Sequence, residues 1–118
     1  MELKISQRNV SGVSVVDCSG RVIFGDEAAL LRETVKAMLP ATTQIVLNLK
    51  NVTYIDSGGL GTLVGLYSSA QAVGAEVKLA QLTARSLQLL QVTKLLTVFD
   101  VKETEEQAIQ SFTKAASV

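Results

Sequence analysis

The chain contains no histidine and no tryptophan among its 118 residues, and it has a single cysteine. Histidine is the commonest general base and metal ligand at neutral pH, so a Ser-His-Asp triad and a histidine-bound zinc site are excluded. One thiol cannot form an internal disulfide, and the alternating apolar run around Cys18 predicts a buried side chain. We therefore expect neither a metal site nor a cofactor.

Neither sign of charge is in excess, because 11 lysines and arginines balance 11 aspartates and glutamates. Binding of nucleic acid without sequence preference depends on a positive surplus, and no run of basic residues supplies one. Aromatic residues make up only 4% of the chain, too few for platforms that stack single-stranded bases. We expect no nucleic-acid partner.

Long apolar runs are also missing. The first residues, Met1-Glu2-Leu3-Lys4, show no basic stretch followed by an apolar one, so no signal peptide is predicted. The apolar runs are interrupted well before the ~18 residues that a membrane-spanning helix needs. The sequence predicts a cytoplasmic protein that makes no contact with a membrane.

What the sequence does contain is enough apolar material for one core, since hydrophobic residues account for 47% of it. The length suits a single domain, expected over residues 1–118, and a monomer or weak homodimer. In chain order the pattern first predicts a hairpin of two strands, turning at Ser11-Gly12 and ending at Ser19-Gly20, and then a helix from Asp26 that stops before Pro40. A strand at 44–49, a helix after residue 57 that ends near Gly74, a strand at 76–80, a helix at 84–92 and a short strand within 95–101 follow. The last predicted element is a helix that opens at Thr104, with Ala108, Ile109, Phe112 and Ala115 on one face.

This order predicts an α/β fold with four helices. Alternation of strands and helices implies mainly parallel pairing with right-handed crossovers, and the first hairpin makes the sheet mixed. No internal repeat, linker or low-complexity tract interrupts the order.

The segment with the most chemical information runs from Asp56 to Gly61 and reads DSGGLG. It follows a predicted buried strand and opens a helix, where unpaired N–H groups and the helix dipole favour negative charge. Ser57 is the only hydroxyl within it. Its glycines, with Gly65 further on, allow the backbone to approach a ligand, a partner or the neighbouring sheet.

Several interpretations of this segment compete. In the simplest one Ser57 is the helix N-cap and the glycines serve packing, while Asp56 either caps the same helix or orients the hydroxyl. A dinucleotide-binding turn would require a glycine where Val64 stands, and no Gly-Lys-Ser/Thr follows for a P-loop. A serine hydrolase needs the missing histidine. An aspartyl-phosphate receiver needs further carboxylates, and Asp17 and Asp26 do not group with Asp56 in the sequence.

The segment from Ile55 to Gly61, the Gly20-Arg21 pair and the order of elements resemble the STAS domain of anti-sigma factor antagonists, over nearly the whole chain. In that family the serine directly after the aspartate is the phosphoacceptor, which corresponds to Ser57. Gly58 replaces a second serine that is often present, which leaves one acceptor. Many members carry an acidic residue soon after the pair that corresponds to Gly20-Arg21. Here Ile23 and Phe24 stand there, and Asp26 or Glu27 is expected to substitute.

The resemblance implies a partner-switching regulator of transcription, not an enzyme. Unphosphorylated, it would bind a serine-kinase anti-sigma factor and free the sigma factor; that kinase would then phosphorylate Ser57, and a PP2C-type phosphatase would reset it. The alternative is a STAS scaffold or transport-associated subunit without phosphorylation, in which Ser57 is only a cap. The residues expected to bind the partner are Asp56, Gly58, Gly59, Leu60, Gly61 and Asp26.

Overall fold

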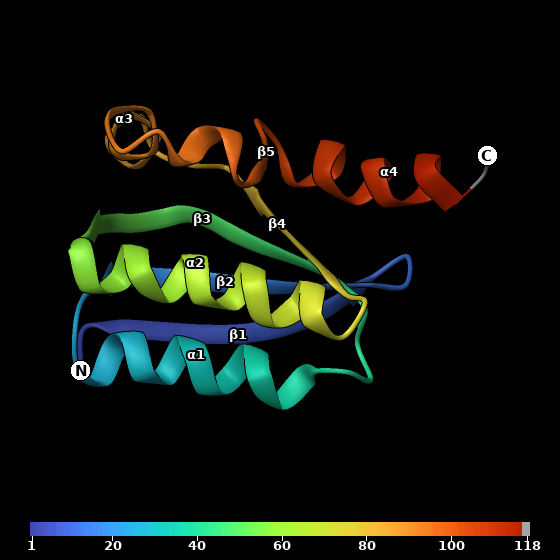
Figure 1. Cartoon of the computed structure of the whole chain (residues 1–118), viewed down its shortest axis with the longest axis horizontal. Coiled ribbons are helices and arrows are strands. Elements are labelled where there is room, and N and C mark those ends of the chain that lie inside the picture. Colours follow the sequence, from blue (N-terminus) through green and yellow to red (C-terminus); the bar gives the residue numbers. More distant parts are fainter. Residues whose placement is uncertain (117–118) are drawn as a thin grey trace.

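A computed structural model of the chain describes the backbone of residues 1–116 and the side chains of residues 1–112. It confirms an α/β fold with four helices and one mixed sheet (Figure 1). The elements are β1 (Leu3–Val10), β2 (Val13–Val22), α1 (Asp26–Met38), β3 (Gln44–Ile55), α2 (Ser57–Ala72), β4 (Glu76–Ala80), α3 (Ala84–Val92), the 3-10 helix η1 (Leu95–Thr97), β5 (Asp100–Lys102) and α4 (Glu105–Ala116).

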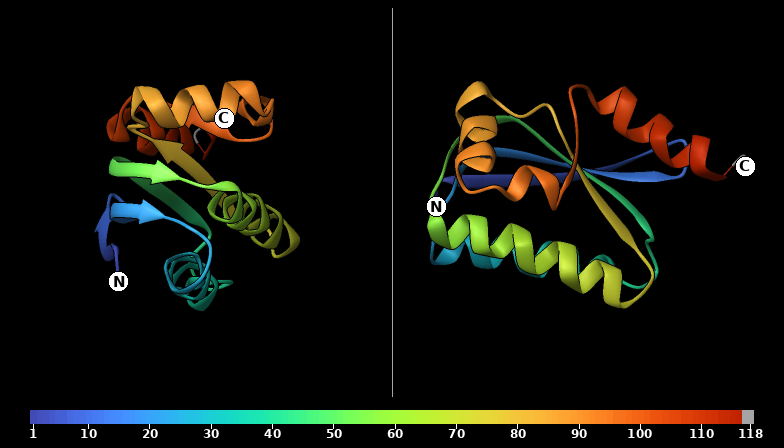
Figure 2. Two further views of the ribbon diagram at one scale, coloured as in Figure 1. Left: turned by 90° about the vertical axis from the view of Figure 1, so that its left-hand side faces the viewer. Right: turned by 45° about the horizontal axis from the view of Figure 1, so that its top comes forward.

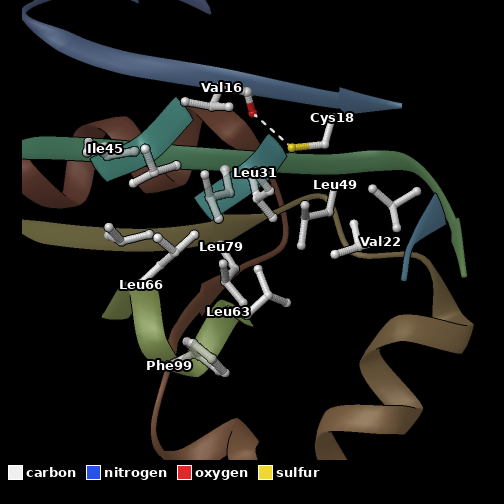
Figure 3. Close-up of a cluster of buried hydrophobic side chains, with 14 of the residues drawn as sticks. Val16, Cys18, Val22, Leu31, Ile45, Leu49, Leu63, Leu66, Leu79 and Phe99 are labelled. Atoms are coloured by element: carbon white, nitrogen blue, oxygen red, sulfur yellow. Dashed lines mark hydrogen bonds between the residues drawn. The ribbon is translucent and has the colours of Figure 1, made fainter. Parts of the chain in front are cut away.

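The strands lie in the order β1-β2-β3-β4-β5, and only β1 runs antiparallel to its neighbour. Helices α1 and α2 lie side by side on one face of the sheet (Figure 2), and α4 packs on the other. Figure 3 shows Leu31 of α1 and Leu63 and Leu66 of α2 gathered with Ile45 and Leu49 of β3. Among the described residues, none of the helices combines the length and the hydrophobicity of a membrane-spanning segment.

The cysteine is buried in this core, as its alternating context predicts. Burial, with a smaller contribution from the charge of Asp17, raises the pKa of the Cys18 thiol to about 12. The thiolate is the reactive form of cysteine, so at neutral pH Cys18 acts as a small apolar side chain.

Helix α4 begins with the predicted capping box. The Gln107 N–H donates to Thr104 Oγ1 at 3.1 Å, and the Thr104 N–H donates to Gln107 Oε1 at 3.4 Å. Its predicted inner face is buried at Ala108, Ile109 and Phe112, whereas the side chain of Ala115 lies outside the described residues.

A buried lysine fastens α4 to the sheet. Lys78 Nζ lies 3.0 Å from Asp100 Oδ2 and donates to Ser111 Oγ at 2.6 Å, and it stands 4.3 Å from the centre of the Phe112 ring. At the start of the helix, Arg8 of β1 pairs with Glu105. The helix is therefore held at its first residue and again at Ser111 and Phe112.

The predicted end of β2 at Ser19-Gly20 is wrong, since the strand continues to Val22. The start of the chain passes so close that a Cβ on Gly20 would lie 2.0 Å from the Glu2 carbonyl oxygen, and Gly20 has a φ of +119°. Only glycine accommodates both conditions, and the pairing with β3 resumes after a register shift there.

Two other strand predictions need correction. The strand predicted at 44–49 continues as β3 to Ile55, because parallel pairing with β2 carries it on. The short strand predicted within 95–101 is instead a 3-10 turn followed by β5. Lys94 adopts a left-handed conformation, and the N–H groups of Val98 and Phe99 both donate to the Leu95 carbonyl, so the chain turns before it pairs.

Candidate functional site

The candidate site lies where β2 and β3 end. Val22 is paired with Ile55 in parallel register, so the loop after β2 and the turn after β3 emerge side by side. Helices α1 and α2 both begin there, at the end of the molecule where the chain starts (Figure 1). Two helix N-termini, each with unpaired N–H groups, therefore share one end of the sheet.

Asp56 joins these two segments. Its carboxylate accepts hydrogen bonds from the Gly59 N–H at 2.7 Å and from the Phe24 N–H at 3.0 and 3.1 Å. The first bond makes Asp56 the N-cap of α2, and the second ties the loop after β2 to that cap. These N–H groups, Gly59 first and Phe24 next, hold the pKa of the Asp56 carboxyl below its ordinary value.

We predict that Asp56→Ala lowers the free energy of unfolding at pH 7 by about 1–2 kcal/mol, the usual effect of losing a cap. Because the pKa of Asp56 is lowered by folding, its stabilisation is complete above the ordinary pKa of about 4 and is lost as the pH falls through the folded-state value. Urea unfolding of wild type and Asp56→Ala at several pH values between neutral and strongly acidic measures this, and the difference between their free energies of unfolding should become smaller in acid.

The matched control is Asp56→Asn, since asparagine caps helices about as well as aspartate without the charge. This variant should keep most of the stability at pH 7 and lose the pH dependence that belongs to residue 56. A gap between wild type and Asp56→Ala that persists unchanged in acid would contradict the assigned role.

Ser57 is exposed and is the first residue of α2. The interpretation in which Ser57 caps the helix is wrong, because Asp56 occupies that position and makes the capping bond. Within the described residues the Ser57 hydroxyl takes part in no hydrogen bond of its own. The site therefore offers an unengaged hydroxyl to solvent at the positive end of a helix dipole.

The other residues of the motif divide into an inner and an outer group. A Cβ on Gly59 would lie 1.9 Å from the Val22 carbonyl oxygen, and one on Gly58 would lie 2.6 Å from Phe24 Cβ. Leu60 is buried in the core. A Cβ on Gly61 would meet nothing within 4 Å. Gly59 and Leu60 thus position the motif by packing against β2 and the core, whereas Gly61 faces outward.

Asp26 is exposed in the first turn of α1, next to the loop that Asp56 holds. Sequence reasoning noted Phe24 only because it stands where an acidic residue was expected. In the structure its side chain is 74% exposed, although its N–H is fixed by Asp56. The backbone of Phe24 is therefore held in place while its ring is available for contact with another molecule.

The sequence analysis named Arg21 only as part of the Gly20-Arg21 pair, and it did not place Arg21 and Arg85 together beside the motif. Arg21 of β2 and Arg85 of α3 lie 5.4 and 5.3 Å from the centre of the Tyr54 ring, which is 37% exposed. Arg21 also pairs with Glu2 at 3.1 Å, and the Glu2 N–H donates to Glu27 at 2.9 Å. The first residues of the chain therefore lie against the same end of the sheet.

The described residues assemble no group of three or more cysteine, aspartate or glutamate side chains that could hold a metal ion. The arrangement at Ser57 offers a hydroxyl, helix N–H groups and an exposed aromatic side chain. It is suited to receiving a phosphoryl group and to contact with another protein.

Comparison with known proteins gives one family. The family model described as "STAS domain" matches residues 4–108. The anti-sigma-B factor antagonist of Bacillus subtilis is 31% identical over 83 residues, which cover 70% of this chain and 76% of that protein.

Solved structures with the same fold come from regulators and from transporters. The anti-sigma factor antagonist SpoIIAA in its unphosphorylated form superposes with a TM-score of 0.72 at 19% identity, over 93% of this chain and 98% of that one. The Bacillus cell fate determinant SpoIIAA in its phosphorylated form superposes with a TM-score of 0.71 at 20% identity, over 92% of this chain and 99% of that one. A sulfate transporter family protein from Wolinella succinogenes superposes with a TM-score of 0.80 at 18% identity, over 92% of this chain and 91% of that one.

Proposed function

The chain belongs to the STAS domain family, and from that premise we propose that it is an anti-sigma factor antagonist controlled by phosphorylation of Ser57. Unphosphorylated, it binds a serine-kinase anti-sigma factor and so frees a sigma factor for transcription. The curated relative supports the role, because it carries the name of an anti-sigma-B factor antagonist. The observation that carries the proposal is the exposed Ser57 hydroxyl, with its helix capped by the neighbouring Asp56.

In the proposed cycle the kinase transfers the γ-phosphoryl group of ATP to Ser57 Oγ, the hydroxyl loses its proton, and ADP leaves. A PP2C-type phosphatase then hydrolyses the phosphoserine with water and releases inorganic phosphate. The STAS domain, proposed to span residues 1–118, supplies the acceptor and the docking surface and performs no catalysis itself. The cycle takes place in the cytoplasm.

Phosphorylation acts on docking, not on folding. It adds roughly −1.5 to −2 charges at Ser57, which the N-terminus of α2 accommodates favourably by about 0.3–1 kcal/mol. A docked kinase surface would have to desolvate that dianion beside the Asp56 carboxylate, which is costly unless a cation is provided. The phosphorylated form is therefore expelled from the complex while the domain keeps its structure.

The test uses the purified chain and the serine-kinase anti-sigma factor of the same bacterium. We expect a complex in the presence of ADP, and after incubation with ATP a mass increase of one phosphoryl group on a peptide containing Ser57. Mass spectrometry and a binding titration measure the two results. A chain that binds the kinase and takes up no phosphate would favour the scaffold alternative, and a chain that does not bind it would refute the proposal.

A further inference from the structure

The motif leaves unexplained a groove of about 570 Å³ between α1 and α2. The two helices lie side by side (Figure 2), and Phe24 and Gly58 stand at the end of the groove nearest Ser57. Gly61 and Gly65 of α2 line it further along. The groove is therefore continuous with the candidate site.

Two glycines in the groove have no role inside the molecule. A Cβ on Gly61 or on Gly65 would meet nothing within 4 Å, and neither residue has a positive φ. Glycine within a helix destabilises it relative to alanine, so these two positions weaken α2 without any internal compensation. Gly59 differs, because the Val22 carbonyl leaves no room for a side chain there. At Gly61 and Gly65 the backbone of α2 is therefore open to close approach from outside the domain.

The charge of the groove is of one sign. Arg32 and Lys36 of α1 line it, both are exposed, and no acidic side chain lines it. The ion pairs found among the described residues involve other cations, namely Arg8, Arg21, Lys78 and Lys102. Arg32 and Lys36 are four residues apart on a helix, so they stand on one face about 6 Å apart along the axis.

We infer that the groove receives an acidic α-helix of the partner, packed against Gly61 and Gly65 and paired through carboxylates with Arg32 and Lys36. Two carboxylates four residues apart on the incoming helix match the spacing of the two cations. The exposed ring of Phe24 provides an apolar contact at the end nearest Ser57. The inference rests on the proposed function for the identity of the partner, the serine-kinase anti-sigma factor.

The test is a binding titration of that kinase, with ADP, against groove variants of the full chain. We expect Gly65→Gln, which fills the groove with a good helix former, and the double variant Arg32→Glu/Lys36→Glu each to weaken binding at least about tenfold. Lys50→Glu is the matched control, because Lys50 is exposed on β3 and does not line the groove. It should bind within about twofold of wild type.

Thermal unfolding shows whether the variants fold, and Gly65→Gln should unfold at a higher temperature than wild type. Amide chemical shifts locate the contact on the wild-type chain, with changes expected at residues 28–36 and 58–69. If the groove variants bind like wild type, or those amides do not respond, the groove assignment is overturned and the proposed function stands. If the wild-type chain binds no kinase, both are overturned.

Discussion

Replacing Ser57 by aspartate is expected to weaken binding of the serine-kinase anti-sigma factor by roughly 100-fold, or about 2.7 kcal/mol. The new carboxylate would stand beside the Asp56 carboxylate, and a docked surface would have to remove water from both. Phosphoserine, with more charge and more bulk, should have a still larger effect. A titration of the kinase with each form of the chain, at fixed ionic strength, measures the affinities.

Two control variants separate charge from the loss of the hydroxyl. Ser57→Ala should bind about as well as wild type and take up no phosphate. Thr43→Asp places the same charge on an exposed residue just before β3, at the opposite end of that strand from the site, and should change the affinity by less than about twofold. If Ser57→Asp bound like wild type, or Thr43→Asp lost binding equally, the charge state of Ser57 would not control docking.

The domain itself should tolerate the charge. Ser57→Asp should unfold at the same temperature as wild type or slightly higher, because its carboxylate lies in the first turn of α2. Amide chemical shifts of the phosphorylated chain should change near residues 23–25 and 56–61 only. Widespread shifts in α4 or β1 would indicate an internal rearrangement instead of a local block.

Gly59→Ala is expected to lower the free energy of unfolding by about 3 kcal/mol, at the upper end for overpacking of a core. The added methyl group would lie 1.9 Å from the Val22 carbonyl oxygen, a backbone atom that cannot move aside as a side chain would. That carbonyl also accepts the Asp56 N–H at 3.3 Å. The start of α2 would have to shift away from β2, which would strain this bond.

Gly61→Ala, two residues along the same helix, is the matched control. Its methyl group meets nothing within 4 Å, so the change should stabilise the domain by about 0.5–1 kcal/mol through helix propensity. Urea unfolding of the two variants compares them directly. A neutral Gly59→Ala would show that α2 and β2 are less closely packed than the structure places them.

Much of the fold follows from hydrophobic periodicity alone. The bounds of β4 and α3 agree with those predicted, because alternating residues and a helical repeat are local signals. The end of β2 was not predictable in this way, since Gly20 is required by the approach of Glu2, a contact between distant residues. The extension of β3 to Ile55 likewise depends on its pairing with β2.

The sequence singled out the candidate site, but it did not show which of its residues caps α2 or which of its glycines pack against the sheet. Both Asp56 and Ser57 are good caps, so the motif alone leaves the choice open. The loop at Phe24, 32 residues earlier in the chain, favours Asp56, because its N–H binds the same carboxylate. Similarly, the sequence does not show which glycines face the sheet and which face outward. That depends on how α2 is rotated against β2.

The position of the first residues has a practical consequence for assays. Glu2 is bonded to Arg21 and Glu27, beside the starts of α1 and α2, whereas α4 runs toward the opposite end of the sheet (Figure 1). A fusion protein or affinity tag placed before Met1 would lie close to the surface that is proposed to dock the kinase. Immobilisation should therefore use a tether that follows α4.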